Sequence, residues 1–76
     1  MYHIKWEIPS IGKVHDYIGD LDCISEICAY CYNLSSWDAF PNITSGWAKG
    51  QTETYHFPGT ADTLTITALE DTFLPF

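Results

Sequence analysis

Residues 22–34, DCISEICAYCYNL, are the one segment of this chain with a clear helical periodicity. Its apolar positions recur three or four residues apart, on one side of a helix, and they are Ile24, Ile27, Cys28, Cys31 and Leu34. Asp22 is the expected N-cap, because its carboxylate can accept hydrogen bonds from the free N–H groups of the first turn. Asn33 and the serines that follow are expected to end the helix. One apolar helix face needs a second apolar layer to cover it.

The segments before the helix have the alternation of strands. Residues 2–8 place four apolar side chains on one side, namely Tyr2, Ile4, Trp6 and Ile8. Pro9 ends this strand because it has no N–H for a strand ladder, and residues 9–12 have the composition of a turn. Residues 13–19, KVHDYIG, fit either a second strand or a short helical turn. We favour the strand, because a single turn joins it to a strand that needs a neighbour.

The segments after the helix complete a small sheet. Residues 35–42 are expected to form a loop, and residues 43–48 a short strand. Residues 51–57 and 63–69 alternate again, with threonines on one side of the second segment. The sequence therefore predicts one α+β domain over residues 1–76, with the order β-β-α-β-β-β. In this fold an antiparallel sheet of four or five strands carries one helix on one face, and residues 70–76 form an acidic, then apolar tail.

The charge of the chain is the sharpest guide to its partners. Ten carboxylates face three lysines and no arginine, which gives a net charge of −7. Such a chain is repelled by nucleic acid and by anionic membranes, because both bind through Lys and Arg. By charge, its natural partner is a protein with a basic surface. No run of 18 apolar residues and no export signal is seen, so we expect a cytoplasmic protein.

Two groups of residues are the candidates for contact with such a partner. Four acids lie at the second strand and the helix start, where they could imitate the phosphate spacing of nucleic acid: Asp16, Asp20, Asp22 and Glu26. The duller alternative is helix capping and a solvated surface. The second group follows the helix and consists of Trp37, Asp38, Phe40 and Trp47. One of its three aromatic residues, or a residue of the tail, could supply a desolvated anchor. Large aromatic residues in a connector otherwise plug the end of the core.

The chain resembles, in composition alone, small phage-encoded inhibitors such as anti-CRISPR proteins and nucleic-acid mimics. The features in common are its size, its acidity, the absence of arginine and aromatic residues in the loops. This resemblance implies a non-enzymatic protein that occludes a basic, nucleic-acid-handling surface of a larger protein in a host cell. It implies no cofactor.

The cysteines support weaker alternatives. Cys28 and Cys31 form a C-x-x-C pair that could share zinc with His15 or His56, but both also belong to the apolar stripe, where free Cys packs as a small hydrophobe. We therefore expect no metal site and no thiol enzyme, since the pair lies in the helix interior rather than at its start. A homo-oligomeric structural protein, joined through the apolar tail of residues 73–76, is the remaining alternative.

Overall fold

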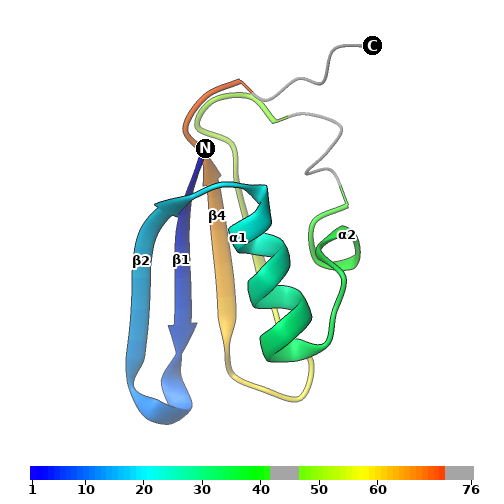
Figure 1. Ribbon diagram of the computed structural model, residues 1–76. Coiled ribbons are helices and arrows are strands. Elements are labelled where there is room, and N and C mark those ends of the chain that lie inside the picture. The colour runs from blue at the N-terminus through cyan, green and yellow to red at the C-terminus, as the bar shows by residue number, and fades with distance from the viewer. Residues whose placement is uncertain (42–46, 72–76) are drawn as a thin grey trace.

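A single antiparallel sheet with a helix across one face makes up the fold (Figure 1). The computed structural model describes residues 1–41 and 47–71, except for the side chains of Ser36 and Trp37. The strands are β1 (Tyr2–Ile8), β2 (Lys13–Gly19), β3 (Thr52–His56) and β4 (Thr63–Ala68), in the sheet order β2-β1-β4-β3. The helical elements are η1 (Pro9–Ile11), α1 (Leu21–Glu26), η2 (Ile27–Cys31) and α2 (Ser36–Ala39). The expected α+β class and antiparallel sheet are confirmed.

The first two strands form a hairpin, so the segment that fitted either a strand or a helical turn is a strand. Tyr2 lies opposite Gly19 and Ile8 lies opposite Lys13, without a bulge in between. The turn closes through a 3₁₀ turn and Gly12, whose φ of 64° is a left-handed conformation that glycine adopts at little cost. β1 pairs with β4 on its other side, which makes β2 one edge of the sheet and β3 the other.

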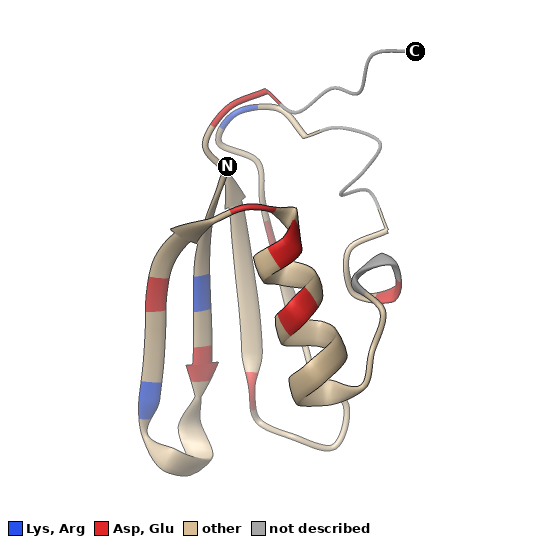
Figure 2. Cartoon of the chain, viewed as in Figure 1, with Lys and Arg blue, Asp and Glu red and all other residues tan. Residues whose placement is uncertain are grey.

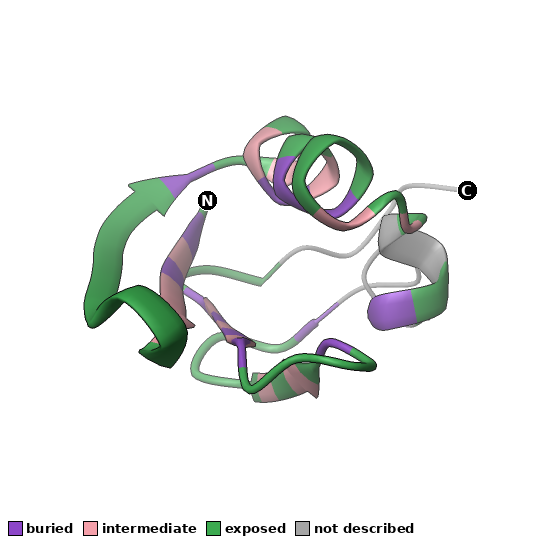
Figure 3. Cartoon of the chain, turned by 90° about the horizontal axis from the view of Figure 1, so that it is seen from below, coloured by how far each residue is buried: buried purple, intermediate pink, exposed green. Residues whose placement is uncertain are grey.

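The core lies between the sheet and the helix. Alternate residues of the central strands face the helix, as the pattern of β1 and β4 predicts. They are almost fully buried along β4 and at Tyr2 and Ile4 of β1, whereas Trp6 and Ile8 are half-buried. The buried apolar residues are Tyr2, Ile4, Ile24, Ile27, Cys28, Ala39, Phe40, Trp47, Phe57, Leu64, Ile66 and Ala68. Figure 3 shows the two layers end-on, with β2 exposed along nearly its whole length beyond the helix.

The helix begins two residues earlier than the sequence predicts. Asp20, not Asp22, is the N-cap, and its side chain accepts a hydrogen bond from the Cys23 N–H at 3.2 Å. Its extended backbone lets the carboxylate fold back over the first turn. Asp22 instead lies in the first turn, where the helix dipole still favours its negative charge.

The second half of the helix is a π-helical stretch, and this changes which residues face the core. In η2 the hydrogen-bonded spacing is five residues instead of four, so Tyr32 rather than Cys31 follows Ile27 on the inner side. Cys31, expected on the buried stripe, is exposed, and Tyr32 is partly buried. Asn33, with a φ of 52°, ends the helix, and the Leu34 N–H donates to the Cys28 carbonyl at 2.9 Å.

The connector after the helix is more ordered than the expected loop. The short helix α2 occupies part of it and leads to Phe40. Most of the strand expected over residues 43–48 lies outside the described residues, as does the tail beyond residue 71, and Trp47 and Ala48 belong to no strand. In the part of the chain that the structure describes, no helix has both the length and the apolar character needed to cross a membrane.

Candidate protein-binding surface

The outer side of the helix is an acidic surface that ends in an exposed tyrosine. Asp22 and Glu26 lie one turn apart and are both exposed. Tyr30, a further turn along, has 85% of its surface exposed. Figure 2 shows acidic positions and no lysine on α1 and η2. We call Asp22, Glu26 and Tyr30 the helix stripe.

In the described part of the chain, the acids of the helix stripe have no cation beside them, in contrast to Glu7 and Glu70. Among residues 1–41 and 47–71, the ion pairs join the N-terminus to Glu70, His3 to Asp16 and Lys5 to Glu7. The pKa of the Glu70 carboxyl is lowered, chiefly by the hydrogen bond from the N-terminal ammonium. Asp22, Glu26 and Asp38 have no such partner in this part of the chain. Their charge is therefore directed entirely to solvent or to a partner.

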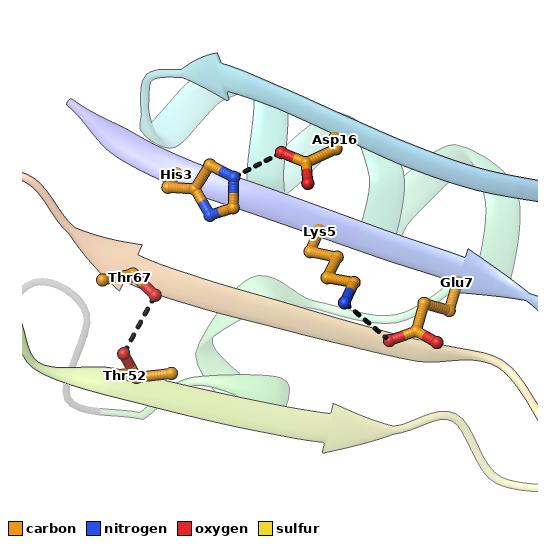
Figure 4. Close-up of polar contacts among 6 residues, drawn as sticks. All are labelled: His3, Lys5, Glu7, Asp16, Thr52 and Thr67. Atoms are coloured by element: carbon orange, nitrogen blue, oxygen red, sulfur yellow. Dashed lines mark hydrogen bonds and ion pairs between the residues drawn. The ribbon is translucent and has the colours of Figure 1, made fainter.

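The four acids expected to form one cluster are divided between two faces. Asp16 lies opposite Lys5 in the hairpin and contacts His3 on the sheet face that the helix leaves open (Figure 4). Asp20 is engaged as the helix cap. Alternation along β2 directs every second side chain away from the helix, so Asp16 cannot share a surface with Asp22 or Glu26. The predicted cluster of four is thus reduced to the two acids of the helix stripe, with the capping Asp20 beside them.

Over β1, β3 and β4 the open sheet face is polar and internally paired, whereas on β2 it also exposes the apolar side chains of Val14 and Ile18. Threonines of β3 and β4 face each other across the strands. The Oγ1 atoms of Thr52 and Thr67 are 2.9 Å apart (Figure 4), and those of Thr54 and Thr65 are 3.1 Å apart. Lys5 and Glu7 lie on the same face, 3.8 Å apart. Because its charges and hydroxyls satisfy one another, this face offers little to a charged partner.

The aromatic residues expected to anchor a partner are placed in the core. Phe40 is 1% exposed and Trp47 is 0% exposed, and their rings contact each other with centroids 6.2 Å apart. They plug the end of the core, which removes both from the partner-facing surface. The Trp37 side chain lies outside the described residues, and Asp38 is exposed on α2. Tyr30 is the exposed aromatic of the helix, and its place outside the apolar stripe was the signal in the sequence.

Tyr32 joins the hairpin, the helix and the loop before β4. Its hydroxyl accepts a hydrogen bond from Trp6 Nε1 at 2.8 Å and donates one to Asp62 Oδ2 at 2.7 Å. Its ring stacks on Phe57 with centroids 3.5 Å apart. Burial, followed by the hydrogen bond to Asp62, raises the pKa of Tyr32 to about 12. The sequence analysis missed this contact, since it depends on the π-helical shift.

The two cysteines of the C-x-x-C pair lie in different environments. Cys28 is buried, and burial raises the pKa of its thiol to about 11, whereas Cys31 is exposed. Within residues 1–41 and 47–71, no three His, Cys, Asp or Glu side chains are grouped closely enough to hold a metal ion. The ring of His15 packs against the ring of Trp6, with centroids 5.2 Å apart.

Comparison of the chain with protein-family models, with curated proteins and with solved structures finds no match. The geometry of the surface alone therefore directs the functional proposal.

Proposed function

We propose that this protein is a non-enzymatic binding protein whose helix stripe occludes a basic surface of a larger, nucleic-acid-handling protein. The single observation that carries the proposal is the unpaired charge of Asp22 and Glu26 beside the exposed Tyr30. The composition of the chain resembles that of small phage-encoded inhibitors, so we propose that it acts in the cytoplasm of a host cell, as an anti-defence protein of the anti-CRISPR kind.

The charge distribution supports this role. Residues 1–19 contain Lys5 and Lys13 against Glu7 and Asp16, and their formal charge is zero. Residues 20–76 contain eight carboxylates against Lys49, so they hold the whole net charge of −7. A field of one sign over the helix side attracts a basic partner and orients it before contact.

The mechanism has an electrostatic step and an anchoring step. Asp22 and Glu26 approach lysines and arginines that otherwise contact phosphate, and each pair formed denies that site to nucleic acid. Tyr30 then packs into the interface, because its ring is large, rigid and amphipathic and already faces outward. Phe40 and Trp47 support the surface from within the core and make no contact with the partner.

The test is capture from a nucleic-acid-free bacterial lysate on the immobilised protein at low salt, with elution by a salt gradient. Wild type is compared with Asp22→Lys/Glu26→Lys and with a matched control, Glu7→Lys/Asp16→Lys, which changes the net charge equally on the open face. A basic protein retained by wild type and by the control, but bound at least about tenfold more weakly by the helix variant, supports the proposal. The nucleic-acid binding of that protein must also fall when the wild-type chain is added.

Two outcomes would contradict the proposal. One is retention that is equal for all three proteins, and the other is retention that does not weaken as salt rises. A complex built on exposed charge pairs must weaken with salt, because the Debye length falls to about 8 Å at physiological ionic strength.

A further inference from the structure

The strand β2 is an open edge of the sheet with apolar side chains on it. Residues 13–18 are all exposed, and Val14, Tyr17 and Ile18 have 57%, 37% and 61% of their surface exposed. An edge strand presents a row of unpaired backbone N–H and C=O groups that can pair with another strand. Proteins usually protect such an edge with proline, a bulge or charged side chains. β2 has no proline and pairs with β1 without a bulge, and its charged residues are Lys13 at one end and Asp16 in the middle.

The other edge is different. β3 is two residues shorter, and its exposed side chains are Thr52, Thr54 and His56. It also belongs to the acidic part of the chain, since Glu53 lies within it. Because its exposed side chains are polar, contact between two copies at β3 would bring no exposed apolar side chains together.

We infer that β2 pairs antiparallel with β2 of a second copy of this chain, which joins two four-stranded sheets into one of eight strands. The occupant is a second copy because the hairpin has zero formal charge, whereas the remainder of each copy has −7. Two such chains repel each other over most of their surface, and the repulsion is smallest at the hairpin, where Asp16 is the only like charge that the two edges bring face to face. This inference does not depend on the proposed function, because it rests on the exposed edge of β2 and not on the acids of the helix stripe.

A twofold axis through Asp16 gives this pairing complementary contacts. Val14 then lies opposite Ile18 of the second copy, and Ile18 lies opposite its Val14, on the open face. On the helix side His15 lies opposite Tyr17, and Lys13 lies opposite Gly19, next to the acidic helix start. Directly opposed side chains of this kind are the stabilising unit of an antiparallel pair. The Asp16 residues of the two copies lie opposite each other on the axis, and each carboxylate contacts His3 of the same copy.

The pairing predicts an unusual salt dependence. Salt screens the repulsion between two chains of charge −7 and leaves the apolar pairs intact. The dimer is therefore expected to strengthen as salt rises, whereas the complex with a basic partner weakens. The contact is a single strand long, so the dimer is expected to be weak and to depend on protein concentration.

Sedimentation equilibrium of the full chain over a wide range of protein concentration, at low and high salt, tests this inference. Wild type should form dimers, and Ile18→Lys should remain monomeric, because it places two lysines in the interface. Thr54→Lys is the matched control, since it makes the same charge change at an exposed position of the β3 edge, and it should dimerise like wild type. Circular dichroism confirms that each variant is folded.

A second variant keeps the test valid if Ile18→Lys fails to fold. Asp16→Asn removes the like charges on the axis and should tighten the dimer by up to about fivefold, since a cross-strand pair is worth up to about 1 kcal/mol. Wild type that stays monomeric at high salt would overturn the inference. A dimer that Thr54→Lys or deletion of residues 72–76 dissociates, while Ile18→Lys does not, would also overturn it. So would a β2 edge that pairs only with a strand of another protein.

Discussion

The hairpin of residues 1–19 and the remainder of the chain differ in net charge and in the side chains that they expose. The hairpin has zero formal charge and an exposed apolar edge, whereas residues 20–76 have a charge of −7 and an acidic helix. The polar contacts differ in the same way, because Glu7 of the hairpin lies beside Lys5 and Asp16 contacts His3, whereas among the described residues no cation lies beside the acids of the helix stripe. Under the proposed function, unpaired charge rather than total charge selects the surface for a basic partner. The predictions below test how the two regions are joined and how far they act separately.

Ile4→Ala should have the largest effect, because Ile4 joins the hairpin to the core and is 0% exposed. The loss of a buried isoleucine costs about 2–5 kcal/mol, which approaches the whole stability of a small domain. Val14→Ala, on the exposed edge of the same hairpin, should change the free energy of unfolding by less than about 0.5 kcal/mol. Urea unfolding measures the change in the free energy of unfolding for both variants. Equal changes would mean that the contacts of Ile4 with the core do not hold the hairpin in place.

Tyr32→Phe should cost about 1–3 kcal/mol, because it leaves the buried Asp62 carboxylate and the Trp6 N–H without the hydroxyl they share. Tyr30→Phe is the control and should have almost no effect, since Tyr30 is exposed. The measurement is urea unfolding near neutral pH.

The same hydroxyl predicts a pH dependence. The pKa of Tyr32 is raised from 10.0 to about 12 in the folded chain, so its stabilisation is complete below pH 10. It is then lost as pH rises to about 12, because the unfolded chain releases this proton first. The stability difference between wild type and Tyr32→Phe should narrow over this window. A difference that stays constant would show that the hydrogen bonds do not control the ionisation of Tyr32.

Gly19→Ala tests the junction between the two regions and should cost about 1–3 kcal/mol through overpacking. A Cβ at this position would lie 2.9 Å from Cys23 Sγ and 3.0 Å from Ile4 Cδ1. Thermal unfolding should show a lower midpoint for this variant than for wild type. An unchanged midpoint would mean that the helix start can move away from β2 at little cost.

Asp16→Asn should have the smallest effect on folding, within about 1 kcal/mol, because its contact with His3 is exposed to solvent. The variant separates association from folding, since it should tighten the dimer while leaving the free energy of unfolding of the chain nearly unchanged. Unfolding and sedimentation of the same sample measure both quantities. A large loss of stability would show that the open face contributes more to folding than paired surface charges do.

The sequence predicted the strands because their side chains alternate with a period of two, and this alternation can be recognised within each segment by itself. It also located most of the helix, since Ile24, Ile27 and Cys28 keep a helical spacing. It failed at Cys31 and Tyr32, because the apolar pattern fits an α-helix and the π-helical shift depends on contacts with Trp6, Phe57 and Asp62 from distant segments.

The candidate site was predicted less well than the fold. Neighbours along the sequence need not share a face, and the alternation of β2 separates Asp16 from the helix acids. The sequence could not decide whether Phe40 and Trp47 plug the core or face a partner, because both uses need a large aromatic residue. Only the packing, which buries both, distinguishes them.

The most direct test of the account is an amide chemical-shift map of the labelled protein during titration with oligolysine, a probe that carries the charge of a basic partner. If the helix stripe and the β2 edge are separate surfaces, the largest chemical-shift changes should lie in α1 and η2, from Asp22 to Tyr30, and should vanish at high salt. The amide shifts of β2 should stay unchanged. The largest changes on β2, or changes spread evenly over both regions, would contradict the claim that unpaired charge on the helix defines the binding surface.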